Sequence, residues 1–136
     1  MAVFVDTNVL LYAVSTVPDE REKSATALAI LDRDDLVLSV QVLQEFYVQA
    51  TRATKPDRLA HESAVSLVES WLRYSIVETT VSLVQQALAT AARWRISYWD
   101  AAIIEAARSG DCAELFSEDL QNGMNFAGVT VRNPFA

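Results

Sequence analysis

Four carboxylates in this sequence have neighbours that charged side chains rarely have. Asp6 directly follows the apolar run at residues 3–5, and Asp119 comes shortly after another short apolar run. Glu45 lies at the edge of an apolar helical face, and Asp100 falls in the first turn of a very apolar helical segment. Carboxylates brought close together repel one another unless a cation lies between them. Hard oxygen ligands and phosphate substrates accompany Mg²⁺ or Mn²⁺, so a cluster of these four would point to metal-assisted chemistry on a phosphate.

Each of these acids also has an ordinary structural explanation. Asp6 could simply end a strand and cap a turn. Asp100 stands three residues after Ser97, which is the spacing of a capping box, and spacing alone favours that explanation. Glu45 on a helix flank is more often solvated, and Asp119 competes with the acid that precedes it in a loop. It is the joint placement of the four that favours a site.

The elements that must position these acids follow from the hydrophobic pattern. Short apolar runs, typical of strands buried on both faces, alternate with longer segments of helical spacing. The predicted strands are residues 3–5, 36–38, 75–78, 115–116 and, at an edge of the sheet, 129–131. The predicted helices are residues 9–13, 18–31, 40–50, 58–71, 81–95 and 97–109. This alternation predicts one α/β domain, residues 1–136, with a parallel sheet of four or five strands between helical layers.

Several residues are suited to the ends of these helices. Thr7 or Asn8 is expected to cap the first helix, Ser39 the helix after the second strand, and Asp57 the helix after a proline break. Gly110 suits the position just past a helix end. In a parallel sheet the strand ends and the early helix turns lie on one edge, so the four acids are expected to share that edge.

Composition narrows the class of protein. The sequence is 51% hydrophobic and has a net charge of −7, with 18 acidic and 11 basic residues, which argues against broad, non-specific nucleic-acid binding. Cys112 is the one cysteine, and no secretory signal is recognisable, so a cytoplasmic location is expected. No stretch approaches the roughly 20 apolar residues needed to span a bilayer, so no membrane partner is expected.

A basic and aromatic segment precedes Asp100. Arg93 and Arg95 run into Tyr98 and Trp99, and such a mixture can bind the phosphates and stack the bases of single-stranded or looped RNA. Basic residues at a helix C-terminus beside buried tryptophans explain the segment equally well. For the second basic group, at residues 52–58, a solvated turn is the favoured interpretation.

Four segments of the sequence, taken in order, resemble the four motifs of PIN-domain proteins, and most of all the VapC-type toxins of bacterial toxin–antitoxin pairs. They are VDTNVL at 5–10, QEF at 44–46, SYWDAAII at 97–104 and LFSEDL at 115–120. The first and third are the most specific. The resemblance extends from residue 3 to about residue 131, which is nearly the whole chain.

The resemblance implies a PIN-like three-layer sandwich and a metal-dependent endoribonuclease. The ligands that it implies for one or two Mg²⁺ or Mn²⁺ ions are Asp6, Glu45, Asp100 and Asp119. Thr7 and Ser117 match the hydroxyl positions that orient those carboxylates. Metal-activated water would attack the phosphodiester and leave a 5′-phosphate and a 3′-hydroxyl.

The resemblance also implies a homodimer and a cognate antitoxin that blocks the acidic site. An antitoxin helix could lie on apolar residues near the first helix, although core burial explains the same residues: Leu10, Leu11, Tyr12, Val14 and Leu28. Two other functions stay open, a PIN nuclease of housekeeping RNA processing and a non-catalytic RNA- or protein-binding module. A phosphoryl-transfer domain with Asp6 as nucleophile is disfavoured, because Asn8 stands where a second acid would be expected.

Overall fold

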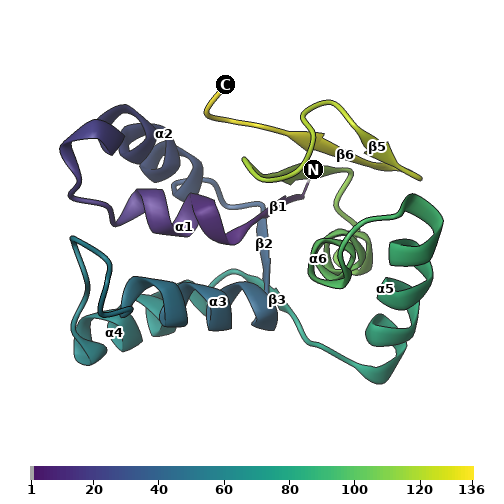
Figure 1. The fold of residues 1–136 in the computed structure, drawn as a ribbon, viewed down its shortest axis with the longest axis horizontal. Coiled ribbons are helices and arrows are strands. Elements are labelled where there is room, and N and C mark those ends of the chain that lie inside the picture. Colours follow the sequence, from purple (N-terminus) through teal and green to yellow (C-terminus); the bar gives the residue numbers. More distant parts are fainter. Residues whose placement is uncertain (1) are drawn as a thin grey trace.

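The computed structural model describes residues 2–136 (Figure 1). The strands are β1 (Val3–Val5), β2 (Leu36–Ser39), β3 (Ser75–Val77), β4 (Glu114–Phe116), β5 (Asn125–Phe126) and β6 (Val129–Arg132). The helices are α1 (Thr7–Ala13), α2 (Arg21–Leu31), α3 (Val40–Ala50), α4 (His61–Trp71), α5 (Val81–Trp94) and α6 (Tyr98–Ser109), with a 3₁₀ turn, η1 (Pro18–Glu20), before α2.

The strands form one six-stranded sheet in the order β3-β2-β1-β4-β6-β5. The first five of these strands are parallel to one another, and β5 alone runs antiparallel, to β6. The predicted α/β fold is therefore confirmed. The prediction of an edge position for residues 129–131 is wrong, because β5 covers that edge. With only two residues, β5 is too short to show an alternating pattern in the sequence.

The order in which successive strands are added to the sheet reverses at β1. It proceeds outward from β1 to β2 and β3, and then returns to the opposite side of β1 with β4. Such a reversal leaves a crevice outside the carboxyl ends of the two central strands, which is where ligands bind in open α/β sheets. Asp6 follows β1 and Ser117 follows β4, so the fold brings these two residues to the crevice.

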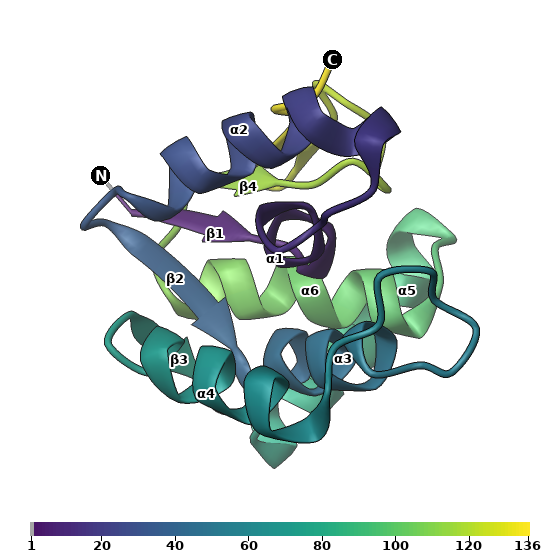
Figure 2. The ribbon, with the colours of Figure 1, turned by 90° about the vertical axis from the view of Figure 1, so that its left-hand side faces the viewer.

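Helices cover both faces of the sheet. Figure 2 shows α2 above the strands and α6 below them, with α3 and α4 further down. α6 is buried along Ala101–Ala107, and four of those seven residues are alanine. The small side chains let this helix lie close to its neighbours. Because the helix is buried on almost every side, its sequence is apolar almost all round. Together with the fully buried β1 and β2, it forms the centre of the core.

Two predicted helix starts need correction. Asp6 itself caps α1, since its side chain accepts the backbone N–H of Thr7; the structural explanation considered for Asp6 is thus confirmed, and the predicted cap by Thr7 or Asn8 is wrong. α4 begins at His61 without a side-chain cap, later than predicted. Asp57, its predicted cap, instead accepts the backbone N–H of Thr16 at 2.9 Å and pairs with Lys55 at 2.9 Å. That long-range contact competes with capping and has no sequence signature.

Gly110 ends α6 for a different reason than predicted. Its φ is −85°, so it does not use the left-handed region, which is adopted by the following Asp111 with φ 58°. A Cβ at position 110 would lie 2.8 Å from Val37 Cγ1 and 3.3 Å from Val77 Cγ2. The residue is small because the helix end lies directly against β2 and β3. By contrast, the predicted Ser39 cap of α3 is confirmed, with Val42 N–H donating to its hydroxyl at 3.2 Å.

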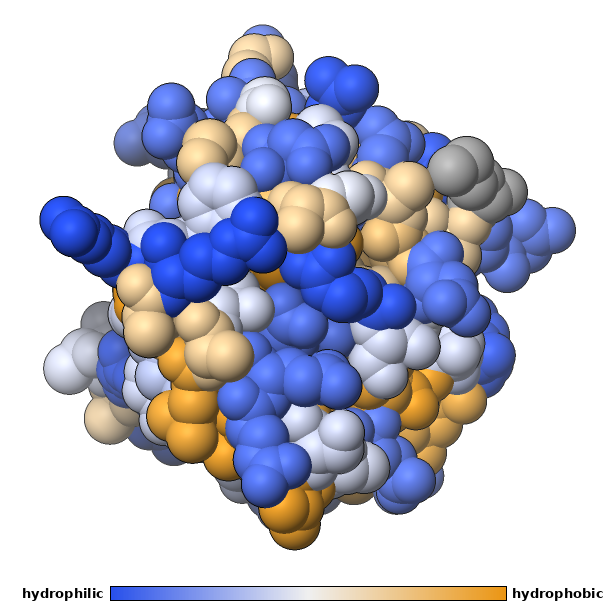
Figure 3. Space-filling model, turned by 90° about the vertical axis from the view of Figure 1, so that its right-hand side faces the viewer, coloured by the Kyte–Doolittle hydropathy of each residue, from blue (hydrophilic) through white to orange (hydrophobic). Residues whose placement is uncertain are grey.

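The outer surface is mixed in character. Figure 3 shows the face at the right of Figure 1, where hydrophobic side chains form small separate patches among hydrophilic ones. Val81 and Leu88 of α5 are among the exposed large hydrophobic residues. None of the helices within residues 2–136 is both long and apolar enough to cross a membrane.

Candidate active site

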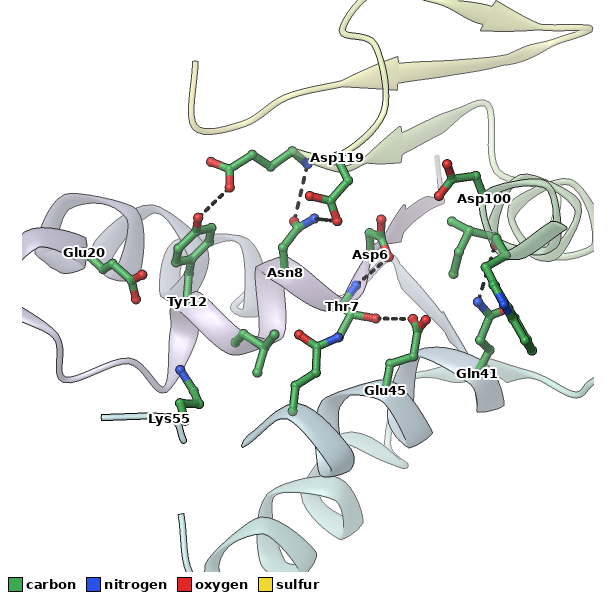
Figure 4. Close-up of a pocket in the computed structure, with 15 residues that line it drawn as sticks. Asp6, Thr7, Asn8, Tyr12, Glu20, Gln41, Glu45, Lys55, Asp100 and Asp119 are labelled. Carbon is green, nitrogen blue, oxygen red and sulfur yellow. Dashed lines mark hydrogen bonds between the residues drawn. The ribbon is translucent and has the colours of Figure 1, made fainter. Parts of the chain in front are cut away.

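The four predicted carboxylates line one pocket of about 300 Å³. Each comes from a different part of the chain: Asp6 from the end of β1, Glu45 from α3, Asp100 from the first turn of α6, and Asp119 from the loop after β4. Figure 4 shows these side chains around Thr7 at the start of α1. The parallel sheet has therefore brought to one edge acids that lie up to 113 positions apart in the sequence, from Asp6 to Asp119.

Asp6 is the most constrained of the four. It is 7% exposed, and it accepts the Thr7 N–H at 2.7 Å and the Ser117 hydroxyl at 2.8 Å. Burial raises the pKa of Asp6 to about 6, an effect that the two hydrogen bonds oppose and the charges of Asp119 and Glu45 reinforce. The site thus holds its central carboxylate in an environment that disfavours its charge and would favour a cation beside it.

Neutral groups hold the flanking carboxylates. Thr7 Oγ1 donates to Glu45 Oε1 at 2.8 Å, which ties α1 to α3. Asn8 Nδ2 donates to Asp119 Oδ2 at 3.2 Å. The Asp119 N–H donates to the Ser117 hydroxyl at 3.1 Å, so Ser117 bridges the backbone of Asp119 and the carboxylate of Asp6. These bonds orient the acids without neutralising them.

Asp100 takes part in the cap of α6 through its backbone N–H, while its carboxylate has no hydrogen-bond partner among the described residues. The Ser97 hydroxyl accepts the Asp100 N–H at 3.1 Å, which is one half of a capping box. Within residues 2–136 no hydrogen bond to the Asp100 side chain is formed, so the reciprocal half is missing. Helix capping explains Ser97 but does not use the acid of Asp100, which faces the pocket.

Glu118 and Asp119 have different roles, which the sequence leaves undecided. Glu118 accepts hydrogen bonds from Tyr12 and from Lys23, the latter at 2.6 Å. Burial raises the pKa of Glu118, but these two donors outweigh it and leave the pKa below its ordinary value. Glu118 is therefore an ion-paired residue at the pocket wall, while the exposed Asp119 has no cationic partner among the described residues. The lysine comes from α2, so no local pattern could have shown this pairing.

The donor chemistry of the pocket fits a divalent ion. Within residues 2–136 no three acidic, histidine or cysteine side chains lie close enough together to enclose a metal by themselves. Mg²⁺ does not need such a cage, since it keeps several of its waters and takes one or two carboxylates from the protein. Glu45 Oε2 and Asp119 Oδ1 accept no hydrogen bond from another residue of that part of the chain, so ligand oxygens are free at the pocket.

The predicted RNA-binding arginines lie outside the pocket. Arg93 and Arg95 are exposed at the end of α5, with the Arg93 guanidinium 5.0 Å from the centre of the Trp94 ring. Lys55 lines the pocket instead, from the predicted turn after α3, where it pairs with Asp57 at 2.9 Å. Trp99 lines it as well and is 63% exposed.

The apolar residues considered as a binding surface for an antitoxin helix lie in different environments in the structure. Leu10 belongs entirely to the core, with 0% exposure. Leu11 and Tyr12 line the acidic pocket, and Leu28 is exposed on α2. They therefore do not form one continuous groove.

Fold and pocket together define an α/β domain with an acidic site at the switch point of its sheet. The chain belongs to the PIN-domain family: the sequence profile of the PIN domain matches residues 3–121. PIN-domain nucleases are typically metal-dependent ribonucleases that bind a divalent metal. The resemblance inferred from the four motifs is thereby confirmed. A search among curated proteins found no significant match.

Solved structures of toxins share this fold. VapC20 of Mycobacterium tuberculosis, described as a sarcin–ricin loop cleaving toxin, superposes with a TM-score of 0.69 at 21% identity, over 87% of this chain and 92% of its own. A toxin–antitoxin complex from Klebsiella pneumoniae gives a TM-score of 0.67 at 18% identity, over 99% and 98% of the two chains. FitAcB from Neisseria gonorrhoeae gives a TM-score of 0.64 at 19% identity, over 98% of both chains. At these identities the likeness establishes the fold, which is that of VapC-type toxins.

Proposed function

We propose that this protein is a metal-dependent endoribonuclease that cleaves single-stranded or looped RNA, and the toxin of a type II toxin–antitoxin pair. Residues 1–136 form one PIN-like domain acting on cytoplasmic RNA. The observation that carries the proposal is the convergence of four acids, from four separate elements, on one pocket at the switch point of a PIN fold.

Asp6, Glu45, Asp100 and Asp119 would hold one or two Mg²⁺ or Mn²⁺ ions, with one or two carboxylates on each ion and water in its other positions. A bound ion of this kind lowers the pKa of its water and stabilises charge on the leaving oxygen. Ser117 and the Thr7 N–H keep Asp6 in its orientation, and the Thr7 hydroxyl does the same for Glu45. Attack by water, rather than by the 2′-hydroxyl of the RNA, leaves a 5′-phosphate and a 3′-hydroxyl.

The assignment as a toxin draws on the neighbouring structures. Structures with this fold were solved as toxin–antitoxin complexes, and one is named for cleavage of the sarcin–ricin loop. By analogy the partners of this chain are an RNA substrate, a cognate antitoxin protein and a second copy of the chain in a homodimer.

The test compares the wild-type protein with Asp6→Asn. After induction in cells, sequencing of RNA ends should reveal new 5′-phosphate ends with wild type and none with Asp6→Asn. The purified wild type should cleave the same RNA in Mg²⁺ and lose that activity in EDTA. Asp34→Asn, which removes an exposed acid before β2 that does not line the pocket, is the matched control and should cleave like wild type.

The outcomes separate the alternatives. Cleavage that persists in EDTA would contradict the metal mechanism, and equal effects of wild type and Asp6→Asn in cells would favour a non-catalytic binding module. New ends confined to one RNA precursor, without growth arrest, would replace the toxin assignment by a housekeeping role in RNA processing.

A further inference from the structure

The acidic pocket continues into a groove along α3. A second hollow, of about 350 Å³, shares Gln41, Glu45, Gln49 and Trp99 with the pocket. A third, of about 210 Å³, shares Gln49 with both and ends at the connection after α3. The three hollows therefore form one path that leads away from the carboxylates across the outer face of α3.

Trp99 lies where the pocket meets this groove. It directly precedes Asp100 in the first turn of α6 and is 63% exposed. Among the exposed large hydrophobic residues of the described chain it is the one aromatic. Its backbone is held by Gln41, whose amide donates to the Trp99 carbonyl at 3.4 Å, and its ring meets Tyr98 edge-on at 5.0 Å between centroids. A large ring is thus held in position while much of its surface remains free.

The wall of the groove carries groups that recognise nucleotides. Successive turns of α3 place three glutamine amides along the groove, those of the exposed Gln44 and of the half-buried Gln41 and Gln49. A glutamine amide both donates and accepts hydrogen bonds, as the edge of a base requires. Arg52, at the far end, lines two of the hollows and forms no ion pair with a described residue. A guanidinium there is free to take a phosphate.

The length of the groove suits a short single strand. From residue 41 to residue 52, α3 and its last turn rise about 17 Å, enough for a few nucleotides. A peptide helix would need a continuous apolar seam. The second hollow offers one aliphatic side chain, Val48, among glutamines, Glu45, an arginine and the tryptophan ring. A more apolar hollow between α3 and α4 shares Gln44 and Val48 with it, but none of the residues of the acidic pocket, so it is not part of the path from the carboxylates. Its chemistry therefore favours RNA over a protein partner.

We infer that Trp99 is the stacking platform for a base next to the cleaved phosphodiester, and that the adjoining strand lies along α3 towards Arg52. The inference rests on the proposed function, since it takes the pocket as the place of cleavage. It assigns substrate binding to the groove on α3 and not to Arg93 and Arg95, which lie outside it.

Binding measured without cleavage tests the stacking platform. In the non-cleaving Asp6→Asn protein, the affinity for fluorescently labelled oligoadenylate is compared for Trp99, Trp99→Phe and Trp99→Ala. Removal of one stacked base should weaken binding roughly 10- to 100-fold in the alanine variant, with a smaller loss when a ring is retained. Leu72→Ala, at a 54% exposed apolar residue outside the groove, is the matched control and should leave binding unchanged.

An oligonucleotide with abasic residues identifies stacking as the cause. If the ring stacks on a base, Trp99→Ala should make no further difference to the binding of this probe. Equal binding of oligoadenylate by the Trp99 and Trp99→Ala proteins would overturn the inference. So would a loss of antitoxin binding with RNA affinity intact, because the face would then be a protein-docking surface.

The salt dependence of RNA binding tests the role of Arg52 at the other end of the groove. Arg52→Gln should reduce the slope of log affinity against log salt concentration by about 0.7, as expected for one phosphate contact in a single strand. Gln44→Ala should change the preference among homopolymers without changing that slope. An unchanged slope in Arg52→Gln would contradict the proposed path. All these experiments measure the binding of RNA and not its cleavage. If they fail, the proposed groove is wrong, while the comparison of cleavage by wild type and Asp6→Asn still tests the proposed function.

Discussion

Burial and neighbouring charge both disfavour the ionised form of Asp6. The pKa is raised from 3.8 to about 6, with desolvation as the largest cause. The unfolded chain therefore gives up this proton at lower pH than the folded protein does. In the metal-free protein the contribution of Asp6 to stability is fully present below about pH 4 and is lost as the pH rises through about 6. The total loss is on the order of 3 kcal/mol.

Asp6→Asn should therefore stabilise the metal-free protein at neutral pH. Asparagine keeps the shape of the side chain and its acceptor for the Thr7 N–H, without a charge to desolvate. Urea unfolding in EDTA should give a free-energy gain over wild type that grows from pH 4 to pH 6 and then levels off. Asp34→Asn, at an exposed acid, should show no such trend. A wild type that is the more stable protein at pH 7.5 would refute this account of Asp6.

At the scale of elements, one arginine fastens the β5–β6 hairpin to α6. Arg108 donates to the carbonyls of Phe126 and Ala127 at 2.8 and 2.7 Å, and to both oxygens of Glu105. Glu105 is 3% exposed and also accepts the Thr90 hydroxyl of α5 at 2.8 Å. The outer strand β5 has only two residues, so these contacts add to the pairing of β6 with β4 in holding the hairpin to the rest of the molecule.

Arg108→Met should destabilise the protein by about 3 kcal/mol, because it leaves the Glu105 carboxylate buried without its cation. Adding Glu105→Gln should recover part of that loss by removing the charge. Urea unfolding measures both effects, and hydrogen exchange should show earlier opening of the β5 and β6 amides. Arg33→Met, which breaks an exposed local pair with Asp35, should cost less than about 1 kcal/mol. Equal effects of the two arginine substitutions would contradict the role of this contact.

For the whole molecule, the acidic pocket adds to an excess of negative charge. The sequence carries a net charge of −7, and four acids share one pocket without a cation among their described partners. Any salt will screen such charge, but a divalent ion held by the pocket acts in addition through binding to the folded state alone. The two effects can be separated.

Mg²⁺ or Mn²⁺ should raise the melting temperature of wild type beyond the effect of KCl at equal ionic strength. At a hundredfold excess over the dissociation constant the gain corresponds to about 2.7 kcal/mol. Asp6→Asn should lose most of this specific gain and keep the screening effect, as scanning calorimetry would show. Equal stabilisation of both proteins by Mg²⁺ would indicate screening only and would contradict a metal site at the pocket.

Much of this architecture can be predicted from local patterns. Val3–Val5 and Leu36–Ser39 are buried strands whose apolar runs are unmistakable, and the Ser39 cap follows from residue type and spacing. The acids at the ends of such strands stand out for the same reason, since burial of neighbours in sequence is a local property. Glu45 and Asp100 lie on helices, where ordinary explanations compete, so their selection depended on the joint placement of the four acids and on the resemblance of the four motifs.

Other features depend on contacts between distant residues. The proton affinity of Asp6 depends on Ser117 and Asp119, and the difference between Glu118 and Asp119 depends on Lys23 from another helix. The added strand β5, the late start of α4 and the groove from Trp99 to Arg52 arise in the same way. Chain patterns encode which side chains are buried, but the pairing of strands and helices determines which charges and rings meet. For this protein the sequence therefore indicated the acids, and the packing of α1, α3 and α6 around them shaped the site.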